Sequence, residues 1–382
     1  MPERRTDERT LSWPSRVTPS GTDGHSPLEK VIAEDVLPRV GALNAPTKIL
    51  ATSGIFWGPL KNRGVRGSIV SDDHRVYMRN GKVIGGRDAA GTSLTSDLGE
   101  RILLTKSEAK QHLQRAGLPV PRGRVFSPDD LESAQAYASS SSGPVVVKPN
   151  GRTSGEGVAT GLRSESMVAA AWRSATAASI QAERPRPWDP EPRDEDRVDR
   201  ILVEDDDAGL ALRVFVTGEQ VLGAVIRLPM FVVGDGDRSI GELIAELVEW
   251  RASHAFLKRM TPREKVVERR LEHLGLVADA VPGAGEVCRV QESPNIHLGG
   301  LSLDVTDRLH PALADLAIEA RWAIPGVLAA GIDLSVPRIS SSRGVVIGVN
   351  ERASQQIHLY PAFGSPRNVT HGIIDLFARS RS

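Results

Sequence analysis

A short β-branched run that ends in a lysine and a proline constrains the fold of this chain more than any other feature. Val145–Val147 predicts a buried strand, and Pro149 after Lys148 ends it, because proline has no N–H to donate to a neighbouring strand. The segment that follows, residues 150–157, contains three glycines, which allow backbone N–H groups to approach a ligand closely. A lysine at a strand end beside such a loop suits a polyphosphate. The alternative is a surface lysine before an ordinary turn.

Composition excludes several classes of protein. The 48 basic and 48 acidic residues cancel, so no global field attracts nucleic acid or an anionic membrane. No apolar stretch approaches the roughly 18 residues that a membrane span requires. The single Cys288 excludes an internal disulfide, agrees with a reducing cytoplasm, and lies in an apolar alternation typical of a strand. We therefore expect a cytoplasmic protein with neither a nucleic-acid nor a membrane partner.

The 382 residues leave room for two or three domains or one multi-lobed enzyme, and the sequence predicts four regions. Residues 1–45 are expected to be a disordered tail, because their start is rich in Arg, Thr, Ser and Pro. Residues 46–98 predict a small α/β segment with a hairpin turn at Asn80-Gly81. Residues 99–200 predict one lobe, which includes a proline- and charge-rich exposed loop at 181–200, and residues 201–382 predict a second lobe.

Periodicity and turn signals predict the main elements of the two lobes. Helices are expected at 107–116, 129–139, 240–253 and 311–323, and strands at 145–148, 201–204, 210–217, 221–227, 331–336 and 345–350. The last two strands form an antiparallel hairpin that carries Asp333 and Asn350. Oxygen ligands on adjacent strands suit Mg²⁺, which binds one or two protein groups together with phosphate oxygens. The alternative is a cross-strand polar pair.

Several nucleotide and hydrolase motifs are missing from the sequence. Gly81-Lys82 is followed by Val83, so no phosphate-binding P-loop is present. The pair Gly155-x-Gly157 lacks the third glycine of a dinucleotide fingerprint, and neither a zinc-protease H-E-x-x-H nor a G-x-S-x-G elbow occurs. The features that remain as candidates for function are cations suited to phosphate and the hairpin that carries Asp333 and Asn350.

An ordered series of motifs over roughly residues 95–380 resembles the ATP-grasp ligases, in particular the ATP-grasp modules of cyanophycin synthetase and bifunctional glutathione synthetases. The series is Lys106, Gly117-Leu118-Pro119, Val147-Lys148-Pro149, Gly155-x-Gly157, Leu202-Val203-Glu204, Gly209-x-x-x-Arg213, Arg227-Leu228-Pro229, Gly234-Asp235-Gly236, Asn295-Ile296-His297-Leu298-Gly299-Gly300, Gly331-Ile332-Asp333, His358-Leu359-x-Pro361 and Pro366-Arg367-Asn368. The resemblance implies an α+β ATP-grasp fold, in which two α/β lobes grip ATP and a small N-terminal α/β segment precedes them.

The resemblance also implies a reaction and a set of roles. The family activates a carboxylate with ATP to an acyl phosphate, which an amine then attacks to give an amide. Phosphate contacts are expected from Lys106, Lys148, Ser154, Gly155 and Gly157, with residues 150–157 as a lid. Glu204 and Asp205 are expected at the adenine hinge, Arg213, Arg227 and Asn295 at the reacting groups, and Asp333, Asn350 and Glu351 at Mg²⁺ or Mn²⁺. His358 is either a packing residue or a substrate contact.

Amino acids are the implied substrates, with glutamate plus a second amino acid as one candidate pair, and relatives associate, so a homo-oligomer is expected. Three positions depart from the pattern. Gly348 stands where the family has a metal-binding glutamate, Ala211 replaces an acid expected at the ribose, and Gln291 replaces an arginine expected at the substrate. Glu351 can supply the missing carboxylate only if the strand ends or bulges at Asn350. The alternative function is therefore a degenerate ATP-grasp protein that binds nucleotide or a partner without turnover.

Overall fold

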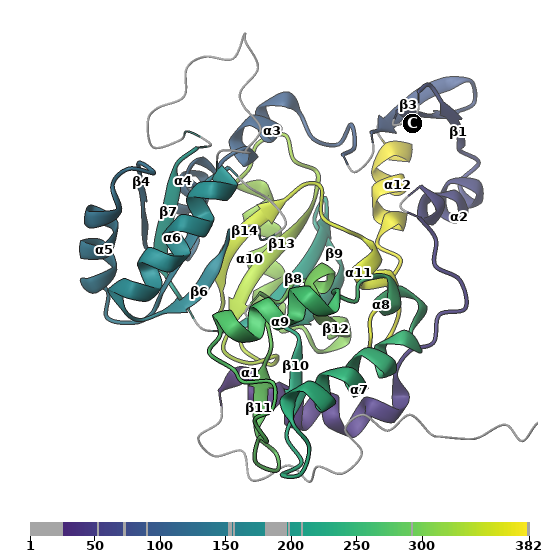
Figure 1. The fold of residues 1–382 in the computed structure, drawn as a ribbon. Coiled ribbons are helices and arrows are strands. Elements are labelled where there is room, and N and C mark those ends of the chain that lie inside the picture. Colours follow the sequence, from purple (N-terminus) through teal and green to yellow (C-terminus); the bar gives the residue numbers. More distant parts are fainter. Residues whose placement is uncertain are drawn as a thin grey trace, which may run out of the picture.

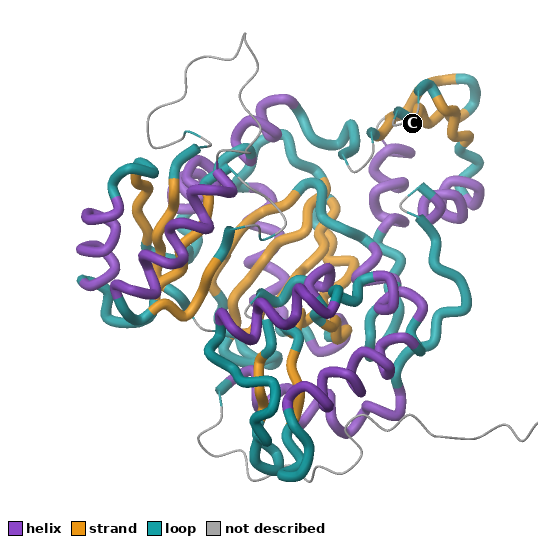
Figure 2. Tube along the Cα trace, in the orientation of Figure 1, coloured by secondary structure: helices purple, strands orange, loops and turns teal. Residues whose placement is uncertain are grey.

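The computed structural model describes residues 26–51, 53–71, 74–88, 91–151, 155, 157–179, 197, 199–207, 209–291 and 293–379 (Figure 1). Two sheets form two lobes, and a smaller sheet lies beside the second lobe (Figure 2). Helices and antiparallel strands are mixed in each part, which confirms the expected α+β class.

The N-lobe is a four-stranded sheet with two helices on one face. Its strand order is β4 (Gly123–Phe126), β7 (Ile201–Asp205), β5 (Val145–Pro149) and β6 (Ala159–Leu162). The helices α5 (Leu131–Ser139) and α6 (Glu165–Ser179) pack on Val145, Val147 and Val203 in one apolar core. Since side chains alternate along a strand, Lys148 and Glu204 point from the other face, where α4 (Lys106–Arg115) lies.

The C-lobe is a five-stranded antiparallel sheet. Its order is β12 (Leu301–Asp304), β9 (Gln220–Leu228), β8 (Leu210–Thr217), β13 (Ala329–Val336) and β14 (Val345–Asn350). Apolar residues of β8 and β13 share a core with α10 (Pro311–Trp322), and they alternate with the charged residues on the other face. The predicted hairpin of β13 and β14 is confirmed, with a register shift after Asp333.

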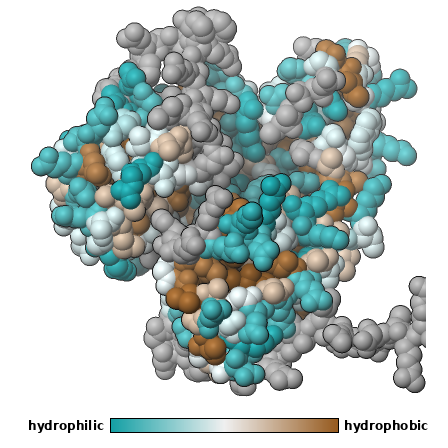
Figure 3. All heavy atoms as spheres, in the orientation of Figure 1, coloured by the Kyte–Doolittle hydropathy of each residue, from teal (hydrophilic) through white to brown (hydrophobic). Residues whose placement is uncertain are grey.

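A ribbon and a group of helices extend the C-lobe. The ribbon pairs β10 (Phe231–Val233) with β11 (Val287–Arg289), and Cys288 is a buried strand residue as expected. Between these strands the chain forms α7 (Ile240–Ala252), α8 (Ala255–Arg259) and α9 (Glu264–His273). The space-filling view shows polar atoms over much of the molecule and an apolar band between the region of α9 and this ribbon (Figure 3). Two further helices of the chain are α3 (Asp97–Leu103) and α11 (Gln356–Leu359).

The N-terminal segment packs against the last helix of the chain. It contains α2 (Gly54–Asn62), β1 (Arg66–Ile69), β2 (Arg75–Arg79) and β3 (Lys82–Arg87), and Tyr77 contacts Phe377 of α12 (Thr370–Arg379). Asn80 and Gly81 both have positive φ, 51° and 75°, which is the backbone of a two-residue hairpin turn and confirms that prediction.

The prediction of a disordered tail over residues 1–45 is wrong for its second half. Residues 26–42 form α1 (Pro27–Val31), a π turn (Ile32–Val36) and a 3₁₀ turn (Leu37–Ala42), whereas residues 1–25 lie outside the described ranges. Ser26 and Glu29 form a capping box, and Ile32 and Val36 recur at helical spacing and are fully buried in the C-lobe core. Asp35 anchors the segment through an ion pair with Arg308 at 2.6 Å.

Candidate functional site

Three charged side chains meet at the inner face of the N-lobe sheet. Lys148 of β5 and Lys110 of α4 both donate to the carboxylate of Glu204 on β7, one lysine to each oxygen. We call Lys110, Lys148 and Glu204 the N-lobe cluster. Lys110 also donates to Pro121 O at 3.0 Å. All three residues are nearly inaccessible to solvent, and Glu204 is only 2% exposed.

Burial and pairing oppose each other in this cluster. Burial raises the pKa of the Glu204 carboxyl, but Lys148 and Lys110 lower it by more than burial raises it. The net shift of this pKa is therefore downward. Burial lowers the pKa of Lys110, and repulsion from Lys148 adds to this effect, whereas Glu204 opposes it. The N-lobe cluster is therefore an ion triad with more positive than negative charge.

The C-lobe presents a second triad, which we call the C-lobe cluster. Asp333 of β13 lies opposite Arg213 of β8, and the guanidinium binds both carboxylate oxygens, Nε to Oδ1 at 2.6 Å and Nη2 to Oδ2 at 2.9 Å. Arg227 of β9 lies diagonally from Arg213 on the same face and contacts Oδ1 at 2.8 Å. Burial lowers the pKa of Arg227, whereas the two arginines lower the pKa of Asp333 against the effect of its burial.

The two clusters lie close enough for their charges to interact. Lys148 lowers the pKa of Asp333 in the opposite lobe, together with the larger contributions of Arg213 and Arg227. Gly155, in the segment 150–157 that we call the glycine loop, lies near the C-lobe as well. A Cβ built on Gly155 would lie 3.4 Å from Ser293 Oγ and 3.9 Å from Asn295 Nδ2. The structure therefore brings Lys148, Gly155, Arg213, Arg227, Asn295 and Asp333 to one region between the lobes.

Other predicted phosphate and hinge residues have structural contacts. Lys106 Nζ donates to the carbonyls of Pro149 and Asn150, at 2.8 and 3.3 Å, so it lies at the base of the glycine loop. Gly157 has a φ of 67°, which requires a glycine there. Asp205 accepts from Ser141 Oγ at 2.8 Å and pairs with Arg122 at 3.3 Å. Ser154 lies outside the described residues.

The predicted metal residues have protein partners in this structure. Both oxygens of Asp333 accept from arginines, and Asn350 Oδ1 accepts from the backbone N–H of Arg352 at 3.1 Å. Strand β14 does end at Asn350, yet the ion pair found for Glu351 is with Arg352 at 3.6 Å. Burial raises the pKa of Glu351, with repulsion from Glu100 adding to it. A metal ion would therefore compete with these hydrogen bonds for the oxygens of Asp333 and Asn350.

Gly348 lies directly opposite Asp333 in the strand register. A Cβ built at Gly348 meets no atom within 4 Å, so the place of a side chain beside Asp333 is open. Within the described ranges, no three His, Cys, Asp or Glu residues are grouped so as to hold a metal ion.

Lys110 was missed by sequence reasoning although a signal existed. Lys110 follows Lys106 by one helical turn, and residues at this spacing share a face of a helix. Its pairing with Glu204 depends on a contact across 94 positions of the chain, which the spacing does not reveal.

His358 is fully buried on α11 and packs edge-on to Phe215, with ring centroids 5.8 Å apart. Burial lowers the pKa of its imidazole to about 3, with Arg213 and Arg227 adding to the effect. Neither ring nitrogen has a hydrogen-bond partner among the described residues. A neutral packing residue describes His358 better than an acid or base.

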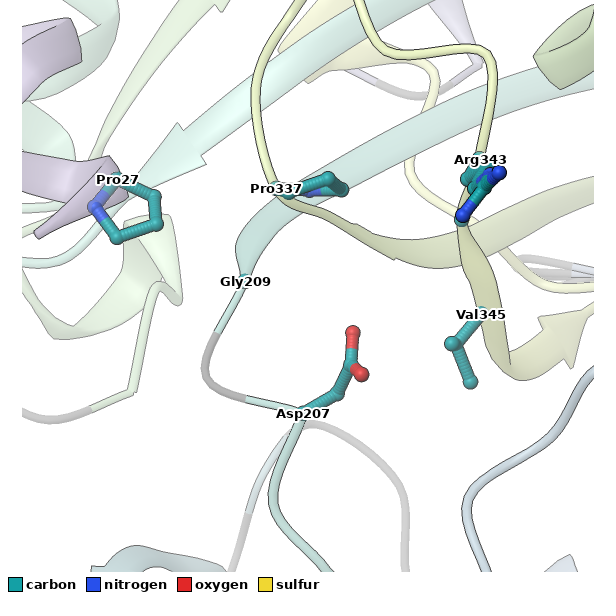
Figure 4. A pocket seen from close by; sticks show the side chains of 7 residues that line it. Pro27, Asp207, Gly209, Pro337, Arg343 and Val345 are labelled. Atoms are coloured by element: carbon teal, nitrogen blue, oxygen red, sulfur yellow. The ribbon is translucent and has the colours of Figure 1, made fainter.

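A cavity of about 270 Å³ lies at the connection between β7 and β8 (Figure 4). Its lining includes Asp207, Gly209, Pro337 and Arg343 and none of the residues of the two clusters. We therefore place the candidate site at the clusters, where buried charges and the glycine loop meet, and not in this cavity. In the described part of the chain, no helix is both long and apolar enough to cross a membrane.

Curated proteins align with most of the chain. Cyanophycin synthetase from Trichormus variabilis is 30% identical over 296 residues, which are 75% of this chain and 30% of that protein. The glutathione biosynthesis bifunctional protein GshAB from Pasteurella multocida is 29% identical over 319 residues, 80% of this chain and 38% of that protein. The chain thus spans well under half the length of these relatives. No protein-family model matches it.

A solved structure shares the fold. The bifunctional glutathione synthetase from Pasteurella multocida matches with a TM-score of 0.56 and 23% identity, over 87% of this chain and 44% of that chain. The match shows that the two-lobed α+β fold is shared. The curated relatives show that this chain belongs to the ATP-grasp family.

Proposed function

We propose that the protein is an ATP-dependent carboxylate–amine ligase that joins two amino acids through an amide bond. The observation that carries this proposal is the surplus of buried positive charge between the lobes. Lys110, Lys148, Arg213 and Arg227 surround only two carboxylates, Glu204 and Asp333. Buried cations without full compensation are costly, and a bound polyanion such as ATP offsets that cost.

The proposed chemistry needs positioning and charge more than covalent help from the protein. A substrate carboxylate oxygen attacks the γ-phosphorus of ATP, the bond to the bridging oxygen breaks, and ADP leaves. The amine nitrogen of the second substrate then attacks the acyl carbon, phosphate leaves, and the nitrogen loses a proton. Negative charge develops on phosphoryl oxygens in the first step and on the acyl oxygen in the second, and fixed cations stabilise both.

We assign the residues as follows. Lys148 and Lys106 bind the phosphates of ATP, together with Gly155, Gly157 and Ser154 of the glycine loop. Glu204 and Asp205 form the hinge beside the adenine. Arg213 and Arg227 stabilise the transferred phosphoryl group, and Asn295 lies against the loop at Gly155. Family members use ATP with a divalent metal ion. For this chain we propose Mg²⁺ near Asp333, with Asn350 and Glu351 as the other candidate ligands and no step assigned to the metal.

The test is phosphate release from ATP in the presence of pooled amino acids, with mass spectrometry of the product. We expect amino-acid-dependent formation of ADP and phosphate together with a product whose mass equals two amino acids less one water. Stoichiometric ADP binding without turnover in every pool would refute the ligase and support the alternative, a nucleotide-binding protein, which the arginine contacts of Asp333 and the glycine at position 348 favour.

The matched variants are Lys148→Met and Lys82→Met. Lys148 lies in the N-lobe cluster, whereas Lys82 is an exposed residue of β3. Loss of a fixed charge at a developing anion costs turnover on the order of 10²-fold. We therefore expect Lys148→Met to be slow by about that factor and Lys82→Met to match the wild type. Equal rates for both variants would remove Lys148 from the proposed machinery.

A further inference from the structure

The loop that carries Asn295 is held from behind by two arginines. Arg251, on the last turn of α7, is completely buried, and its Nη1 donates to the carbonyls of Gly299 and Gly300 at 2.7 and 3.1 Å. Arg270 of α9 donates through Nη1 to the carbonyl of Leu298 at 3.0 Å. Three successive carbonyls of the 295–300 loop therefore accept from guanidinium groups.

The backbone of the loop is shaped for these bonds. Gly299 has a φ of 97°, in the left-handed region, and this conformation lets its carbonyl and that of Gly300 meet the same nitrogen. A Cβ on Gly299 would lie 2.6 Å from Met230 Sδ, and one on Gly300 would lie 2.6 Å from the carbonyl oxygen of Leu228. The two glycines thus let the loop lie directly on the end of β9, the strand that carries Arg227.

Arg251 has no acidic partner among the described residues. Burial alone lowers its pKa, to about 10, and no carboxylate contributes to the shift. Its other contact is a long hydrogen bond from Nη2 to Met260 O at 3.4 Å, and Nε has no partner. Burying a guanidinium without a carboxylate partner is unfavourable, and the hydrogen bonds to these carbonyls offset part of that cost.

The front of the same loop faces the candidate site. Asn295 Oδ1 accepts from the N–H of His297 at 3.0 Å and begins the turn at Ile296–Leu298. Asn295 Nδ2 and Ser293 Oγ are the atoms that lie near Gly155 of the glycine loop. A shift of the 295–300 loop would therefore move Asn295 relative to both Gly155 and Arg227.

We propose that Arg251, assisted by Arg270, is a positioning residue that fixes the 295–300 loop and thereby holds Asn295 beside Gly155. Arg251 touches neither nucleotide nor substrate in this proposal. It acts through the carbonyls of residues 299 and 300. The kinetic consequence rests on the proposed ligase function, whereas the positioning itself is a property of the folded chain.

The test compares Arg251→Met with Arg321→Met. Arg321 is a matched control, because it is also buried, donates to a single carbonyl (Val327 O at 3.1 Å), has an unpartnered Nε, and lies on α10 against Trp322. Hydrogen exchange of the full chain, read on peptides that cover residues 293–303, reports the loop without any need for turnover. Titration with a non-hydrolysable ATP analogue and steady-state kinetics follow.

We expect Arg251→Met to speed exchange in that peptide by about tenfold or more, the scale of losing charge-assisted hydrogen bonds. Turnover should fall by about 10²-fold, as expected for misplaced reacting groups, with the affinity for the ATP analogue little changed. Arg321→Met should lower the melting temperature without either effect. Arg251→Lys keeps a charge and donors and should restore part of the protection. Arg270→Met removes only the bond to Leu298 and should give a smaller effect.

Two results would overturn the proposal. One is a rate of exchange in the 293–303 peptide that Arg251→Met leaves unchanged, and the other is a rate that rises equally across the whole chain in both arginine variants. If the wild type turns over no substrate, the ligase proposal fails, and the exchange result alone still decides the role of Arg251.

Discussion

Replacing Glu204 with glutamine tests whether the N-lobe cluster exists in solution as the structure places it. The change keeps the shape of the side chain but removes the charge that both Lys110 and Lys148 contact. Because Glu204 is only 2% exposed, solvent cannot replace that charge. Removing one partner of a buried ion pair costs about 3–5 kcal/mol, and glutamine still accepts one hydrogen bond. We therefore expect the free energy of unfolding to fall by about 3 kcal/mol at neutral pH.

The matched control is Asp199→Asn in the same lobe. Asp199 pairs with Arg197 at 2.8 Å, but both side chains are close to half exposed. An exposed pair of this kind contributes about 0–1 kcal/mol, so Asp199→Asn should leave the urea midpoint nearly unchanged. The measurement is urea denaturation of both variants, followed by circular dichroism and by tryptophan fluorescence.

The difference in stability between the wild type and Glu204→Gln should depend on pH. The pKa of Glu204 in the folded protein lies below its ordinary value of 4.5, so its contribution to stability is complete above that pH. That contribution is lost as the pH falls through the folded-state pKa. The difference between wild type and Glu204→Gln should therefore be constant from pH 5 to 7 and shrink in more acidic solution. A glutamine variant as stable as the wild type at pH 7 would show that the triad does not form.

Three further experiments test the metal site, the N-terminal segment and His358. Gly348→Glu should fold normally, because its Cβ enters open space beside Asp333, and should bind Mn²⁺ more tightly in a paramagnetic resonance titration; an unchanged titration would contradict this. Ile32→Ala should cost about 2–5 kcal/mol in urea denaturation, as for a buried aliphatic side chain, whereas no cost would return residues 26–42 to a tail. The ring protons of His358 should not shift in NMR spectra between pH 5 and 8, because its pKa is about 3. Since an unfolded histidine titrates near 6.5, this group also makes folding less favourable as the pH falls below that value.

Local signals in the sequence predicted local structure well. The valine run before Lys148 is strand β5, which ends at Pro149 as expected, and the hairpin turn at Asn80 has the backbone that its residues favour. The helix expected at 311–323 is α10, Pro311–Trp322. Each of these depends on residues a few positions apart, where periodicity, proline and glycine act directly on the backbone.

Contacts between distant segments could not be predicted in the same way. That Asp333 is held by Arg213 depends on strand register across 120 positions, and a shift of one residue would have turned one of them to the other face. The chemistry of Asp333 suits a metal ion, but Arg213 and Arg227 compete for the same carboxylate oxygens. Residues 26–42 were misjudged because average composition hid a short apolar pattern that only packing on the C-lobe stabilises.

The N-lobe and C-lobe clusters have the same arrangement of charges, and this arrangement affects how an anion would bind between them. In each lobe one carboxylate, buried for Glu204 and partly buried for Asp333, holds two cations at fixed positions, so the cations are ordered before any ligand arrives. Such preorganised charges stabilise a developing negative charge without the cost of orienting them during the reaction. The carboxylates also reduce the repulsion among the four cations. An anion between the lobes then meets one unit of excess positive charge from each side, so both lobes should contribute to phosphate binding.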